Sequence, residues 1–220
     1  MLDDENIIKQ RDHSDALGVA AHLYEQVAYE CQLEHAAHDG RPLTRVIVAG
    51  RGGSALAADL AKVLFSRTLR VPFEVVKGYE LPASIDEHTL LIASSHSGNT
   101  EETISCFEQA LEAGCQLAAI ATGGKVAEMA NTHDVMYAPI PHDTQPRMGM
   151  IYNLRALERV LCEFGLLDPS ALDELAAAKE WLATESQLWA AHVPTEGNYA
   201  KQLALIAVGK TPVFYAGSLM

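Results

Sequence analysis

Hydrophobic and polar positions follow two different periods along this chain, and the change of period marks its elements. Apolar residues recur every three or four positions over residues 15–38, which predicts an opening amphipathic helix. Shorter β-branched runs without polar gaps, such as TRVIVA, predict strands covered on both faces. Strands are predicted in this way at 44–49, 73–76, 89–94, 116–121 and 134–137, with helices at 55–65, 100–113 and 125–130.

The alternation of strands and helices predicts the fold class. Strands joined by helices run parallel to one another, and the connections are right-handed crossovers. The helices then cover both faces of the sheet. We therefore expect an α/β fold with a doubly wound parallel sheet. Gly114 follows the second helix, where a glycine commonly ends a helix.

The last third of the chain has a different organisation. Residues 148–164 and the Ala-rich residues 170–191 predict connector helices, and a helix at 198–208 with a strand at 211–215 repeats the opening order. A lone strand must pair with something to bury its faces. We expect an N-terminal helical segment over 1–40, a complete α/β domain over 41–165, a connector helix over 166–197 and the start of an incomplete second domain over 198–220.

Charge and apolar run length exclude several classes of partner. The 220 residues hold 16 Lys and Arg against 29 Asp and Glu, a net charge of −13, without a dense basic run, so we expect no nucleic acid and no acidic membrane surface. Apolar stretches fall far short of the ~20 residues that span a bilayer. Acidic residues near the start, Asp3 to Glu5, are unlike a secretion signal, so we expect a cytoplasmic protein.

Three polar turns follow predicted strands, where the crevice of an open parallel sheet lies. The first, residues 50–55 (GRGGSA), is called the glycine turn here; its glycines allow close approach of a ligand to the backbone at a helix N-terminus. It also fits the dinucleotide pattern G-x-G-x-x-G/A, with Glu74 as the ribose-binding acid. A tight turn without a ligand is the third interpretation.

The second turn, residues 94–100 (SSHSGNT), is called the hydroxyl turn here. Four hydroxyls and the N–H groups of the following helix are well matched to a phosphate dianion. Ordinary capping by Asn99 with Glu102 would explain only part of this run. His96 is a candidate for proton transfer, although a plain loop donor is the favoured interpretation, and the helix dipole already explains Glu101 and Glu102.

The third turn, residues 144–147 (TQPR), is called the arginine turn here. Pro146 restricts the turn, so Arg147 is held at a defined place, where it can stabilise an oxyanion or bind sugar oxygens. A surface salt bridge is the ordinary alternative. The histidines show no convincing ligand spacing, so we expect no metal site.

Five motifs occur in an order typical of one family: GRGGSALAADL, GYELP at 78–82, SSHSGNTEET, ATGGKVAEMA and TQPRMGM. Together they resemble the bifunctional phosphoglucose/phosphomannose isomerase family, and LLIASSHSGNTEETI resembles the phosphosugar-binding loop of sugar isomerase (SIS) domains. The likeness covers about residues 44–220. It implies a flavodoxin-like three-layer sandwich.

The resemblance implies an aldose–ketose isomerase that interconverts glucose 6-phosphate, mannose 6-phosphate or both with fructose 6-phosphate through an enediolate. Members of this family use no metal or other cofactor and work as homodimers with two SIS domains per chain. Carried over by motif, the resemblance assigns sugar binding to Gly52, Gly53 and Ser54, phosphate binding to Ser95, Ser97 and Thr100, and enediolate stabilisation to Arg147.

The same resemblance places the catalytic glutamate, histidine and lysine in the second SIS domain, beyond residue 220. We therefore expect this chain to be truncated early in that domain and inactive alone. His96 stands where the family usually has an aromatic residue, a change expected to affect only the packing of the turn. A non-catalytic phosphosugar-binding module is the alternative function.

Overall fold

The computed structural model describes residues 2–142 and 144–215. Contacts within the chain divide it into two compact units. Residues Tyr29–Glu174 form the unit that contains the sheet, called the sheet unit, and Met1–Ala28 with Leu175–Met220 form the other, called the helical unit.

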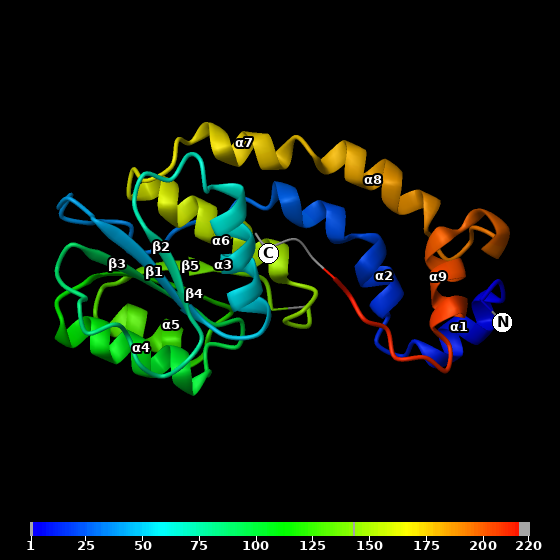
Figure 1. Cartoon of the computed structure of the whole chain (residues 1–220), viewed down its shortest axis with the longest axis horizontal. Helices are drawn as coiled ribbons and strands as arrows, with labels where there is room; N and C mark the ends of the chain where they lie inside the picture. The colour runs from blue at the N-terminus through cyan, green and yellow to red at the C-terminus, as the bar shows by residue number, and fades with distance from the viewer. Residues whose placement is uncertain (1, 143, 216–220) are drawn as a thin grey trace. The chain divides into compact units, whose positions relative to one another are not determined.

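The sheet unit is built on five parallel strands in the spatial order β2-β1-β3-β4-β5 (Figure 1). This is the flavodoxin-like order of a doubly wound sheet, so the predicted fold class is confirmed. The strands are β1 (Arg45–Gly50), β2 (Phe73–Val76), β3 (Thr89–Ser94), β4 (Gln116–Ala121) and β5 (Met136–Pro139).

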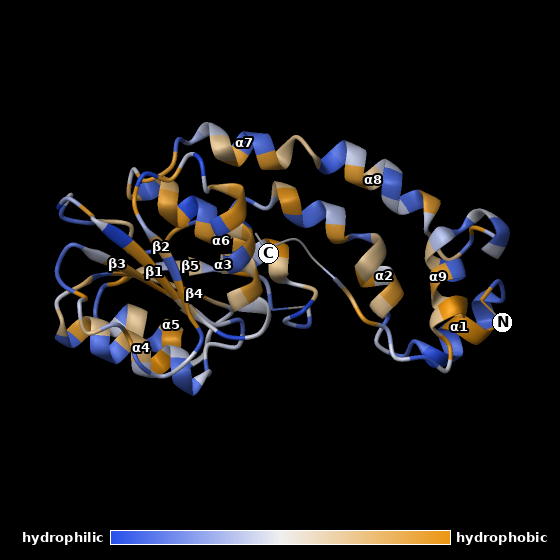
Figure 2. Cartoon of the chain, in the orientation of Figure 1, coloured by the Kyte–Doolittle hydropathy of each residue, from blue (hydrophilic) through white to orange (hydrophobic). Residues whose placement is uncertain are grey.

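Helices cover both faces of this sheet. One face carries α3 (Gly53–Leu64) and α6 (Met150–Glu163), and the other carries α4 (Glu101–Glu112) and α5 (Gly124–Thr132) (Figure 1). The central strands are accordingly apolar along their length, as their colouring in Figure 2 shows. Burial on both faces explains why β1 reads as a continuous run and not as an alternating pattern.

The strands and helices of the sheet unit begin and end within two residues of their predicted positions. β-branched and aliphatic runs between helix-period segments carry enough information to place them. The predicted end of α4 is also confirmed, because Gly114 adopts a φ of +69° directly beyond the helix.

The prediction of one helix over residues 15–38 is wrong. The structure has a short helix α2 (Ala16–Ala21), a 3-10 helix η1 (Leu23–Ala28) and extended chain after it. Glu34 exchanges two backbone hydrogen bonds with Tyr137 of β5, at 2.8 and 2.9 Å. An edge strand has unpaired backbone groups, and covering them outweighs the helical period of this segment.

Two predictions in the C-terminal third are also wrong. The long helix over 170–191 is interrupted after α7 (Ser170–Ala176), and α8 (Lys179–Leu188) follows; no side-chain interaction in the described residues accounts for the break. The strand over 211–215 does not form, and no described strand pairs with it. Residues 216–218 of the predicted Gly/Ser turn lie outside the described residues.

The helical unit also contains α1 (Glu5–Arg11), η2 (Thr195–Gly197) and α9 (Tyr199–Ala207). Lys201 connects three segments of this unit, because Nζ donates to Oδ1 of Asp3 and to the carbonyl oxygens of Ala191 and Val193, at 2.7 to 2.8 Å. The ammonium of Lys201 lowers the pKa of Asp3 below its ordinary value. Within residues 2–142 and 144–215, no helix combines the length and apolar character needed to cross a bilayer.

A buried ion pair on α6 ties together the sheet unit. Arg155 donates to Oε2 of Glu158 at 2.6 Å, and also to the carbonyl oxygens of Tyr29 and Leu172, near the two ends of the unit. The two side chains are only 5% and 1% exposed. Burial raises the pKa of Glu158 to about 7, although Arg155 pulls it down.

Replacing Glu158 tests this pair. Because the native state holds the proton more tightly than the unfolded chain, Glu158 stabilises the fold at low pH and this contribution is lost as the pH rises through about 7. We expect Glu158→Gln to flatten the decline in stability between about pH 5 and 8, measured by urea unfolding. Glu158→Ala should cost about 3–5 kcal/mol, because it leaves the buried charge of Arg155 without a carboxylate. Parallel pH profiles for Glu158→Gln and the original protein would contradict this account.

Candidate functional site

The candidate site lies at the carboxyl ends of β1 and β3. These strands are neighbours, but the helices that follow them, α3 and α4, pack on opposite faces of the sheet. The chain thus changes direction between them, and the loops diverge at the point where open parallel sheets bind ligands. The glycine turn follows β1, and the hydroxyl turn follows β3.

The hydroxyl turn presents both internal and exposed hydroxyls. The side-chain oxygens of Ser95 and Thr100 lie 2.8 Å apart and bond to each other. Ser97 is exposed, and its Oγ accepts only a long bond, 3.3 Å, from the Asn99 N–H. Thr100 occupies the N-cap position of α4 without a side-chain cap bond, so its hydroxyl leaves the first N–H groups of the helix uncapped.

The alternative interpretation, in which Asn99 caps α4, is wrong. Its Oδ1 accepts from the N–H of Lys125 at 3.1 Å, and its Nδ2 donates to the carbonyl oxygen of Ser97 at 3.1 Å. Asn99 therefore connects the hydroxyl turn to the start of α5. A side chain with both a donor and an acceptor suits a bridge between two backbones.

Gly98 and Gly124 allow the hydroxyl turn and the start of α5 to approach each other backbone to backbone. A Cβ on Gly98 would overlap the carbonyl oxygen of Gly123, and a Cβ on Gly124 would lie 2.5 Å from the carbonyl oxygen of Ser97. Both Gly98 and Gly124 also adopt positive φ, +69° and +68°. No residue with a side chain fits either position without displacing the other turn.

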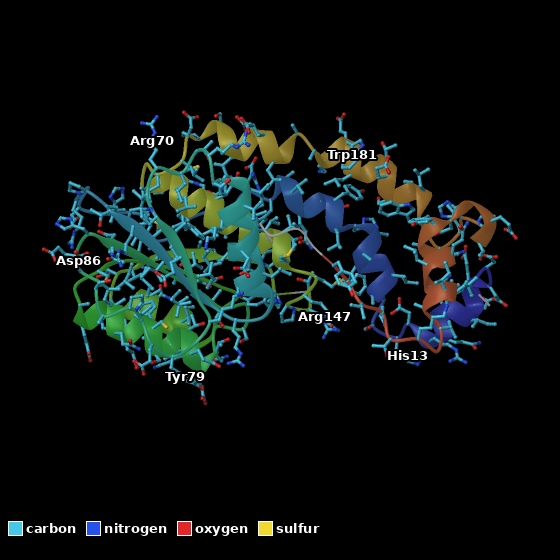
Figure 3. The ribbon with its side chains drawn as sticks, in the orientation of Figure 1. His13, Arg70, Tyr79, Asp86, Arg147 and Trp181 are labelled. Carbon is cyan, nitrogen blue, oxygen red and sulfur yellow. The ribbon has the colours of Figure 1, made fainter. Side chains whose placement is uncertain are left out.

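The arginine turn packs against the glycine turn. A Cβ on Gly53 would lie 2.6 Å from the carbonyl oxygen of Pro146, whereas one on Gly52 would meet nothing within 4 Å. Gly53 is therefore a contact surface, and Gly52 is open. Arg147 is exposed on the turn that precedes α6, and no described residue forms a hydrogen bond or ion pair with its guanidinium (Figure 3).

Ser54 points into the protein. It is only 3% exposed, and its Oγ accepts from the His96 N–H at 3.1 Å and approaches Oδ1 of Asn153 at 3.5 Å. Asn153 also accepts from Ser94 at 3.3 Å and donates to the carbonyl oxygen of Gly149 at 3.1 Å. Asn153 is not among the site residues predicted from the sequence, although it is the single amide in α6 and lies on its buried face.

The same domain is found in known proteins. The family model of the SIS domain matches residues 42–156. This chain belongs to the SIS domain family. Among curated relatives, it is 36% identical to the bifunctional phosphoglucose/phosphomannose isomerase of Caldicellulosiruptor bescii over 173 residues, or 79% of this chain and 51% of the relative.

A protein of the same description from Aquifex aeolicus is 33% identical over 187 residues, covering 84% of this chain and 54% of that protein. The chain thus spans about half the length of these curated relatives. A hypothetical protein from Thermus thermophilus has the same fold, with a TM-score of 0.62 at 19% identity, over 93% of this chain and 51% of that one. The resemblance inferred from the five motifs is confirmed.

Polar and charged side chains beside the glycine turn and the hydroxyl turn interact with one another. The guanidinium of Arg51 contacts the carboxylate of Glu102, and Oε2 of Glu101 accepts from the Tyr79 hydroxyl at 3.3 Å. Glu102, together with burial and Glu101, raises the pKa of Tyr79 above its ordinary value. Tyr79 belongs to the GYELP motif and lies beside α4, where Gln109 donates to its carbonyl oxygen at 2.6 Å (Figure 3).

The interpretation of Glu74 as a ribose-binding acid is wrong. The strand register pairs Glu74 with Ile47, three residues before the end of β1. At about 3.3 Å per residue, this is about 10 Å short of the glycine turn. The dinucleotide pattern of the glycine turn is therefore left without its ribose-binding acid.

A pocket of about 680 Å³ lies in the helical unit, away from the SIS domain's turns in the sequence. It is formed by α1, α2, the end of α8 and α9, and small apolar residues such as Ala190 and Ala204 line much of it. None of the predicted site residues contributes to it. The pocket therefore does not change the location of the candidate site.

The glycine contact predicts a position-specific cost. Gly98 and Gly40 adopt nearly the same φ, +69° and +70°, but a Cβ on Gly40 would meet nothing within 4 Å. Gly98→Ala and Gly40→Ala therefore share the same backbone strain, and only Gly98→Ala adds a collision. We expect Gly98→Ala to cost about 1–3 kcal/mol more in urea unfolding. Equal losses would contradict the close approach of the two turns.

Proposed function

We propose that this chain supplies the substrate-binding half of an aldose–ketose isomerase acting on glucose 6-phosphate, mannose 6-phosphate or both. The reaction yields fructose 6-phosphate through an enediolate. The observation that carries the proposal is the packing of the arginine turn onto the glycine turn beside the uncapped start of α4. A turn that can bind phosphate and the unpaired guanidinium of Arg147 are thereby held close together.

The phosphate binds at the hydroxyl turn. The Ser97 hydroxyl and the first N–H groups of α4 donate to its oxygens, and Ser95 and Thr100 redirect their shared hydroxyl pair toward it. The positive end of the helix dipole favours the dianion. Neutral donors bind it without a full countercharge, so the product can leave.

The sugar lies along the glycine turn, at Gly52 and Gly53, with its reacting carbons toward Arg147. Moving a proton between C1 and C2 creates negative charge on the enediolate oxygens, and a guanidinium held at that place stabilises it. Ser54 supports the site from inside the protein, because its hydroxyl accepts a hydrogen bond from the His96 N–H and faces Asn153. Its contribution is to hold the glycine turn and the hydroxyl turn together.

The base that moves the proton comes from outside these 220 residues. Glu101 and Glu102 are engaged by Tyr79 and Arg51, and His96 is buried against the arginine turn. The resemblance supports this division, since it assigns the catalytic glutamate, histidine and lysine to a second SIS domain. The working protein is a cytoplasmic homodimer that needs no metal or other cofactor.

A non-catalytic phosphosugar-binding module is the second candidate, and the same engagement of the two carboxylates favours it. The two candidates differ in one measurement. If the chain is half of an isomerase, mixing it with the C-terminal half of a longer relative should produce conversion of fructose 6-phosphate. A module would bind the sugar phosphate and show no turnover with any added half.

Ser97→Ala tests the proposed phosphate site. The loss of a hydrogen bond to a charged group should weaken fructose 6-phosphate binding by roughly 1–3 kcal/mol, measured by calorimetry and by the thermal shift that the ligand produces. Ser66→Ala is the matched control, because Ser66 is also exposed and bonds only to a backbone carbonyl, at the end of α3. Unchanged affinity in Ser97→Ala would remove the hydroxyl turn from the site.

A further inference from the structure

His96 is bonded to three turns besides its own. Its backbone N–H donates to Oγ of Ser54 in the glycine turn at 3.1 Å, and its carbonyl oxygen accepts from Thr122, after β4, at 3.0 Å. Its ring Nε2 bonds the carbonyl oxygen of Thr144 in the arginine turn at 3.0 Å. The side chain therefore makes the link that the backbone does not: from the hydroxyl turn to the arginine turn.

The ring is enclosed where it makes this link. His96 is 9% exposed, and a Cβ on Gly149 would lie 2.9 Å from its Cε1. The imidazole is thus held between the start of the arginine turn, at Thr144, and the residue just before α6, at Gly149. Arg147 lies between these two points in the chain, so the ring contacts both ends of the segment that carries it.

The hydrogen-bond inventory of the ring indicates what the histidine adds. A carbonyl oxygen can only accept, so Nε2 carries the proton and Nδ1 is left as an acceptor. Within the described residues, Nδ1 of His96 and Oγ1 of Thr144 are both buried without a partner. Burying unpaired polar atoms costs free energy, and a plain aromatic ring would fill the space without an unpaired Nδ1. The bond from Nε2 to Thr144 is what a histidine provides there.

We propose that His96 is a positioning residue that fixes the arginine turn against the hydroxyl turn, so that Arg147 is held at a set distance from a sugar phosphate bound at the hydroxyl turn. This inference rests on the proposed function for its effect on the ligand. His96 does not touch the reacting atoms; it acts through Arg147. His96 thus has a role beyond the change in packing that is expected from the sequence.

The first experiment compares two replacements with two ligands. His96→Phe keeps the ring and removes the donor, and His96→Gln keeps an N–H at the same reach. We expect His96→Phe to weaken fructose 6-phosphate binding by about 3- to 10-fold, the value of one hydrogen bond. Binding of inorganic phosphate, which needs only the hydroxyl turn, should change less than about twofold, and His96→Gln should restore sugar-phosphate affinity.

A double-mutant cycle separates positioning from general packing. If His96 acts through Arg147, His96→Phe should have no further effect on fructose 6-phosphate affinity in an Arg147→Ala background. Additive effects, a parallel loss of inorganic phosphate binding, or failure of His96→Gln to rescue would each overturn the inference.

Amide hydrogen exchange tests the same link without a ligand. The N–H groups of Met148 and Gly149 both donate to the carbonyl oxygen of Gln145, and they should exchange faster in His96→Phe but not in His96→Gln. If exchange there is unchanged in His96→Phe, the inference is wrong. Faster exchange in a protein that binds no sugar phosphate would support the positioning role and reject the proposed function.

Discussion

Close approach of backbone to backbone is the constraint on which the site depends. The turns at the carboxyl edge of the sheet meet at distances that a single Cβ would violate, at Gly98 against Gly123 and at Gly53 against Pro146. Side-chain contacts between mobile loops would leave several angstroms of freedom. Backbone contact leaves almost none, so the hydroxyl turn is held against the start of α5, and the arginine turn against the glycine turn, before any ligand arrives.

Polar groups behind these contacts complete the arrangement. Asn153 on α6 joins Ser54, Ser94 and the residue before its own helix, and His96 reaches the start of the arginine turn. A buried network of this kind specifies one geometry because each unpaired member would cost free energy. The exposed side chains of Ser97 and Arg147 are thus carried on fixed supports, and no described residue accepts a hydrogen bond from either of them.

The sheet unit could be predicted from the sequence because its information is local. Two-sided burial gives continuous apolar runs, and the glycines that end helices mark the boundaries. Features that depend on tertiary contacts could not be predicted from the sequence. Residues 29–38 have a helical pattern, but Glu34 pairs with the edge strand β5. Likewise, Asn99 has the pattern of a helix cap, and only the fold brings Lys125 close enough to compete for it.

The candidate site also has features that could be predicted from local sequence and features that depend on tertiary packing. The three turns were recognisable from glycines, hydroxyls and a proline-restricted arginine, and their convergence follows from the rule for parallel sheets. The inward direction of Ser54 and the role of Asn153 could not be inferred, because both depend on α6 packing across α3. Residue types identify what can bind; the packing decides which of them face a ligand.

A crystal structure with fructose 6-phosphate bound tests the central claim most directly. The account predicts the phosphate at the hydroxyl turn, within hydrogen-bond distance of Ser97 and the first N–H groups of α4, with the sugar between Gly52 and Arg147. A phosphate bound elsewhere, for example in the pocket of the helical unit, with the hydroxyl turn empty, would contradict it.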